Sequence, residues 1–155
     1  MRLERYDGDH SPHWAAGCGK STWAAAYPCS GVKVVLCADD YLMVDGVYDW
    51  SPEKLSRAHH QCMKRFVESV FYDDADLLIV DGTHTRTEFL TPYIEVGRSF
   101  GHNVRVMYIK HDPIDSWKRN THNVDENKHI NMEKNLHFML KHWSQRLPRI
   151  EVVEV

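Results

Sequence analysis

The segment AAGCGKST, residues 15–22, matches the end of the phosphate-binding pattern GxxxxGK[ST]. Glycines in such a loop allow backbone amides to turn inward around phosphate oxygens, and a following helix directs its positive end toward them. The ammonium of Lys20 could reach the terminal phosphates, and the hydroxyl of Ser21 could bind Mg²⁺. We therefore predict an ATP site; the alternative is a glycine-rich turn followed by a surface lysine. The predicted phosphate-binding residues are Ala16, Gly17, Cys18, Gly19, Lys20, Ser21 and Thr22.

Two acidic segments follow apolar runs that are typical of buried strands. Asp39 and Asp40 follow the run VKVVLC at 32–37, and Asp81 follows DLLIV at 76–80. The carboxyl ends of parallel strands meet at the sheet edge where ligands bind. There, Asp39 or Asp40 could accept the proton of an attacking hydroxyl, and Asp81 could hold Mg²⁺. The alternatives are a solvated turn for the aspartate pair and a helix cap for Asp81.

Further polar and aromatic residues could complete such a site. Arg119 follows Lys118 on a predicted short helix at 113–120, where its guanidinium could stabilise a transferred phosphoryl group. For either residue in isolation, an ordinary basic surface helix is the simpler interpretation. The rings of Tyr48 and Trp50 could stack on a base or serve in packing. The predicted substrate-binding residues are Asp40, Tyr41, Thr83 and His84.

Apolar runs alternate with segments of helical periodicity, which predicts right-handed crossovers and a parallel sheet with helices on both faces. The predicted strands are residues 32–37, 76–80, 103–109 and 150–155, and the predicted helices are 51–71, 87–101, 113–120 and 131–146. Ser51 is the predicted N-cap of the first helix, and Gly101 suits the C-terminal cap of the second. The core-facing stripe predicted for the first helix consists of Leu55, Cys62, Phe66 and Val70.

The segment that should lead into the glycine-rich loop is unusual. A central parallel strand is normally buried on both faces, whereas GDHSPH at 8–13 is polar and contains Pro12. Trp14 stands where the phosphate-binding pattern has its first glycine. We therefore predict that residues 1–13 are poorly ordered or not a strand, and that the first strand is degenerate or missing. Residues 14–155 are expected to form the folded domain.

In their order along the chain, the segments GCGKST, ADDY, VDGTHT and KRNTH resemble the P-loop kinase family that includes the kinase domain of phage polynucleotide kinase. The resemblance covers nearly the whole chain and implies a P-loop NTPase-like α/β fold that binds ATP and Mg²⁺. It implies that Asp39 is the general base for a 5′-hydroxyl, Arg119 the lid arginine and Asp81 the acidic residue at the metal. Leu42 and Asn123 stand where the polynucleotide kinase has arginines, which favours an acceptor smaller than a long polymer.

The expected activity is therefore transfer of the γ-phosphoryl group of ATP to a hydroxyl of a nucleic-acid 5′-end, a modified base or a nucleoside. The alternatives are a nucleotide-binding module without transfer activity and a small-molecule phosphotransferase. A net charge of -3 argues against binding nucleic acid through bulk charge. No apolar run approaches the ~20 residues of a membrane span, and the first residues are too polar for a signal peptide. We expect a cytoplasmic protein, or one in the host cytoplasm if a phage encodes it; the oligomeric state is open.

Overall fold

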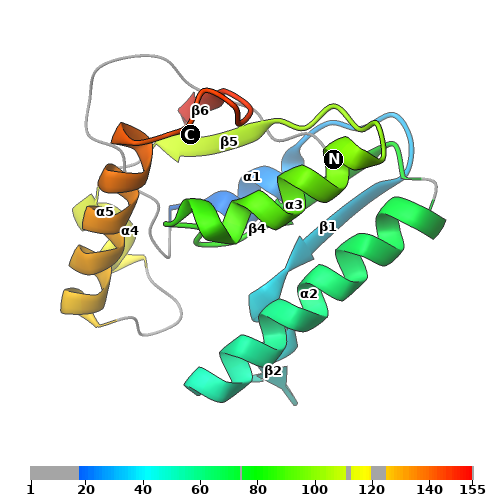
Figure 1. Ribbon diagram of the computed structural model, residues 1–155. Coiled ribbons are helices and arrows are strands. Elements are labelled where there is room, and N and C mark those ends of the chain that lie inside the picture. The colour runs from blue at the N-terminus through cyan, green and yellow to red at the C-terminus, as the bar shows by residue number, and fades with distance from the viewer. Residues whose placement is uncertain (1–17, 74, 111–112, 120–124, 155) are drawn as a thin grey trace.

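The computed structural model describes residues 18–73, 75–110, 113–119 and 125–154 (Figure 1). The expectations for residues 1–13, Ala16, Gly17 and Asn123 lie outside these residues. Along the chain, the elements are α1 (Lys20–Ala26), β1 (Lys33–Cys37), the 3-10 helix η1 (Ala38–Leu42), β2 (Met43–Val44), β3 (Val47–Tyr48), α2 (Pro52–Tyr72), β4 (Leu77–Asp81), α3 (Thr87–Ser99), β5 (Val106–Lys110), α4 (Pro113–Lys118), α5 (Glu126–Lys141) and β6 (Ile150–Glu154). None of the described helices has the length and apolar character needed to cross a membrane.

The longer strands form two parallel pairs, β1 with β4 and β5 with β6, while β2 and β3 form a short antiparallel hairpin. In sequence, α2 and the hairpin separate β1 from β4, and α4 and α5 separate β5 from β6, so each pair is joined by a helical crossover. The α/β class and the parallel pairing are thereby confirmed. Among the described residues, β4 and β5 are not hydrogen-bonded neighbours, so the strands do not form one continuous sheet.

All five residues of β4 are buried. Because successive side chains of a strand point in opposite directions, both faces of β4 are therefore covered. Leu78 and Val80 belong to the main core, which also contains residues of α2, α3, α5 and β5. Leu77 and Ile79 pack instead in a smaller cluster with Ala24 of α1. Helices therefore cover both faces of β4, as the sequence predicts for the sheet.

The helix boundaries follow from local capping groups. The Ser51 hydroxyl accepts a hydrogen bond from the amide of Lys54 at the start of α2 (3.2 Å), as predicted. Gly101 has a φ of 77° just after α3, which also agrees with its predicted capping role. α5 begins and ends earlier than predicted, because the Asp125 carboxylate accepts a hydrogen bond from the amide of Asn127 (2.9 Å) and caps the helix there.

α2 runs alongside β1 (Figure 1) and buries a line of residues at helical spacing, namely Ala58, Cys62, Phe66 and Ser69. The predicted stripe is right for Cys62, Phe66 and Val70, of which Val70 is half-buried and packs against the main core. It is wrong for Leu55, which is half-buried and is not among the residues packed against that core. Leu55 lies in the first turn of α2, before the first buried residue, Ala58. Helical periodicity alone does not show that Leu55 lies outside the core, because its burial depends on what the helix packs against.

Candidate functional site

The loop before α1 holds Gly19 in a conformation that favours glycine. Its φ of 92° lies in the left-handed region, where a side chain would be strained. The carbonyl of Gly19 accepts a hydrogen bond from the amide of Trp23 (2.9 Å), so α1 starts directly after this turn. Cys18 is buried, and the Nζ of Lys20 lies 3.5 Å from its Sγ. Because α1 has seven residues, about two turns, loop amides and the Lys20 ammonium would contribute more to phosphate binding than the helix dipole.

Ser21 and Asp81, the two residues predicted to hold Mg²⁺, are in direct contact. The Ser21 hydroxyl donates a hydrogen bond to Oδ2 of Asp81 over 2.5 Å, between positions 60 residues apart. Ser21 lies in the first turn of α1 and is exposed, whereas Asp81 ends β4 and is 7% exposed. This bond joins the glycine-rich loop to the carboxyl end of a buried strand.

η1 brings Asp39 and Asp40 to the same edge. In the register of β1 and β4, Cys37 lies opposite Asp81, and η1 begins at the next residue. Asp40 is exposed overall, but partial desolvation of its carboxyl raises the pKa of Asp40, and the charges of Asp81 and Asp39 raise it further. Burial and the charge of Asp81 also raise the pKa of Cys37 to about 12, so its thiol stays protonated and is a poor nucleophile at neutral pH. Like charges are thus gathered at this edge, where a cation would relieve their repulsion.

Mg²⁺ suits these residues because it needs few ligands from the protein. Among the residues that the structure describes, no three His, Cys, Asp or Glu side chains form a group that could hold a metal ion. Mg²⁺ is usually held through one or two carboxylates, with water and substrate phosphates as the other ligands. Ser21 and Asp81 offer a hydroxyl and a carboxylate in contact with each other, which meets that requirement.

His84 lies in the interior, whereas the sequence suggests that it stands on the rim of the site. Its side chain is 5% exposed, and Nε2 has no hydrogen-bond partner in the described part of the chain. Burial, assisted by His59 and Lys20, lowers the pKa of His84 to about 4, so the ring is neutral at pH 7. A Cβ at Gly82 would lie 2.8 Å from Nε2, which explains the glycine at that position. Thr83 is half-buried, and contact between substrate and His84 would require the ring to become accessible.

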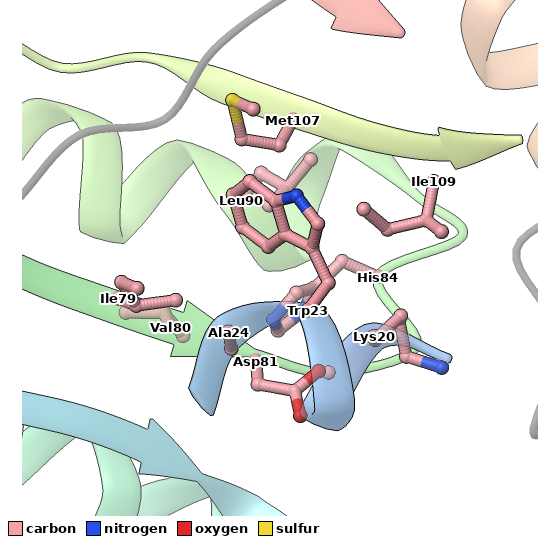
Figure 2. A pocket seen from close by; sticks show the side chains of 11 residues that line it. Lys20, Trp23, Ala24, Ile79, Val80, Asp81, His84, Leu90, Met107 and Ile109 are labelled. Carbon is pink, nitrogen blue, oxygen red and sulfur yellow. The ribbon is translucent and has the colours of Figure 1, made fainter. Parts of the chain in front are cut away.

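A cavity of about 40 Å³ separates β4 from β5 and is lined mainly by apolar side chains. Figure 2 shows the indole of Trp23 between Ile79 of β4 and Met107 and Ile109 of β5. Lys20 also lines this cavity. Ligand pockets normally measure about 300–1,000 Å³, so this space is a packing gap rather than a nucleotide pocket. A nucleotide held by Lys20 would lie outside it, over the edge formed by the ends of the strands.

The remaining predicted residues differ in their accessibility. Thr22 and Asp40 are exposed, Tyr41 is 44% exposed, and Arg119 is exposed directly after α4. These side chains are accessible to a ligand, and their contacts with one stay predictions. Leu42 is 1% exposed and packs in the interior, so this position offers neither charge nor surface to a phosphate.

Tyr48 is a neighbour of Asp39 that the sequence analysis did not identify. Its hydroxyl donates a hydrogen bond to Oδ1 of Asp39 over 2.9 Å. The sequence suggested stacking or packing for this ring. Asp45 and Gly46 form a two-residue turn of the Asp-Gly type, which predicts a hairpin and could have indicated that the chain turns back toward Asp39.

Comparison of the chain with protein-family models and with curated proteins found no match.

Proposed function

We propose that the protein is an ATP-dependent kinase that transfers the γ-phosphoryl group to a hydroxyl acceptor. The observation that carries this proposal is the 2.5 Å hydrogen bond between Ser21 and Asp81. It joins a GKST loop to the end of β4, and Asp39 follows the neighbouring strand at the same edge. The loop, Asp81 and Asp39 thus lie at one edge of the β1–β4 pair, which supports a shared site.

Each residue has a distinct role in this proposal. Lys20 and the loop amides bind the terminal phosphates, and Ser21 and Asp81 would hold Mg²⁺. When bound, Mg²⁺ neutralises charge on the phosphate oxygens. Asp39 accepts the proton of the acceptor hydroxyl. The oxygen of that hydroxyl bonds to the γ-phosphorus as the bond between the γ-phosphorus and the β–γ bridging oxygen breaks, and ADP leaves. Arg119 is the candidate for stabilising charge on the transferred group.

The acceptor class that we propose is a nucleic-acid 5′-end, a modified base or a nucleoside. Tyr41 of η1 and Trp50, which follows the hairpin along the chain, are 44% and 42% exposed and offer rings on which a base could stack. The buried Leu42 contributes no cation, which favours a nucleoside or a short end over a long polyanion. A binding series in increasing salt tests this choice, because contacts to several phosphates would give a steep decrease in affinity.

The direct test measures transfer from radiolabelled ATP to a panel of acceptors, with oligonucleotides, hydroxymethylated DNA, nucleosides and small alcohols. Lys20→Ala should reduce transfer about 100-fold or more, and Asp39→Asn should reduce it by about 10²–10⁴. Lys64→Ala and Asp45→Asn are matched controls: both side chains are exposed, and asparagine tolerates the positive φ of residue 45.

The outcomes separate the proposed function from its alternatives. Transfer that survives Asp39→Asn at a near-normal rate would remove Asp39 as the base. Unchanged ATP affinity in Lys20→Ala would remove the loop as the phosphate site. ATP binding without transfer to any acceptor would identify a nucleotide-binding module, and transfer only to small alcohols would identify a small-molecule phosphotransferase.

A further inference from the structure

The hairpin after Asp39 is not explained by burial of its own apolar side chains. Val44 and Val47, which face each other across the two strands, are 53% and 65% exposed. The turn between them has φ values of 50° at Asp45 and 80° at Gly46, as the favoured two-residue hairpin turn requires. A short two-stranded hairpin is at best marginally stable by itself. Contacts with the rest of the protein must therefore stabilise it.

Two such contacts lie at residues 48 and 49. The Tyr48 hydroxyl donates a hydrogen bond to Oδ1 of Asp39 (2.9 Å), and the next amide, of Asp49, donates to the carbonyl of Leu42 (2.8 Å). Both acceptors belong to η1, so this short helix and the end of the hairpin are held together by a side-chain and a backbone bond. Tyr48 is half-buried, unlike the two valines before it in the hairpin.

The two oxygens of the Asp39 carboxylate differ in their hydrogen bonding within the described part of the chain. Within the described residues, Oδ1 accepts the bond from Tyr48, and no residue donates to Oδ2. Burial and the negative charge of Asp39 raise the pKa of Tyr48, so its hydroxyl keeps the proton and remains a donor at neutral pH. Among the described residues, the titratable groups that interact electrostatically with Asp39 include Cys37 of β1, Asp40 of η1, Tyr48 of β3 and His59 of α2.

We propose that Tyr48 is a positioning residue that holds Oδ1 of Asp39 and so presents Oδ2 to the hydroxyl of the phosphoryl acceptor. This inference rests on the proposed function, because it assumes that Asp39 is the general base. The hairpin therefore serves to place the Tyr48 hydroxyl beside the Asp39 carboxylate. A base held in a single orientation abstracts a proton more effectively than one that rotates freely.

The first test does not depend on activity. The carboxyl ¹³C signal of Asp39 is recorded by NMR near neutral pH in the wild type, in Tyr48→Phe and in the control Tyr72→Phe, which removes a hydroxyl from a tyrosine that is 82% exposed. Because Tyr48→Phe removes the donor to Oδ1, the Asp39 signal should move in that variant. The control should leave it unchanged. An Asp39 signal that is the same in Tyr48→Phe and the wild type would overturn the inference.

The second test measures transfer kinetics near neutral pH. In Tyr48→Phe, kcat should decrease about tenfold with little change in the KM for ATP, whereas Tyr72→Phe should match the wild type. A purely structural role of Tyr48 would instead lower the free energy of unfolding and leave kcat per folded molecule unchanged, which would contradict the inference. If the wild type transfers phosphate to no acceptor, the proposed function fails, and the contact is then decided by the NMR measurement alone.

Discussion

The buried ring of His84 should make the stability of this protein depend on pH. Burial lowers the pKa of His84 to about 4, whereas a histidine in the unfolded chain titrates near 6.5. The unfolded state therefore binds a proton first, and the stability present above pH 6.5 is lost as the pH decreases toward 4. The full difference is worth about 3 kcal/mol, of which about 2 kcal/mol is lost by pH 5.

Replacement of His84 by Gln isolates this effect, because glutamine has no charge at either pH. Urea unfolding would be measured at about pH 7.5 and about pH 5 for the wild type, His84→Gln and the control His137→Gln, whose side chain is exposed. Between the two pH values, the wild type and the control should lose about 2 kcal/mol more unfolding free energy than His84→Gln. Contributions of the groups that the three proteins share cancel in the comparison. Equal losses in the wild type and His84→Gln would refute the reasoning and indicate that water or a partner reaches the ring.

Two further predictions concern the metal pair and the core. Asp81→Asn retains an acceptor for Ser21 but removes the negative charge. MgATP at 100 times Kd should raise the Tm of the wild type by about 5–10 °C, and this increase should be largely lost in the variant. A full increase in the variant would contradict the role of Asp81. The same change should lower the pKa of Asp40, which the Asp81 charge raises. Phe66→Ala should lower the free energy of unfolding in urea by about 3–5 kcal/mol, because Phe66 is fully buried with its ring centroid 5.0 Å from that of Tyr93. The control Phe138→Ala, at a 65% exposed position, should change the free energy of unfolding by no more than about 0.5 kcal/mol.

The longer strands and helices could be predicted because their signals are local, whereas η1, β2 and β3 were not predicted. Runs of β-branched and leucine residues mark β1, β4, β5 and β6, and Ser51 followed by Pro52 marks the start of α2. Their alternation predicts parallel strands, since a helical crossover returns the chain in the same direction. The same signals place Asp39 and Asp81 after the ends of two strands that pair in the fold, which is why the candidate carboxylates could be named from the sequence.

The sequence by itself determined the α/β class, the parallel direction of the strands and the positions of the loop and the carboxylates along the chain, because these follow from local patterns and their order. That the longer strands form two separate pairs among the described residues was decided by the tertiary structure. Only the tertiary structure decided which side chains meet: Ser21 with Asp81 across 60 positions, and the hydroxyl of Tyr48 with Asp39. It also decided that His84 lies inside rather than on the rim. These outcomes depend on strand register and on what each segment packs against, and no local pattern carries that information.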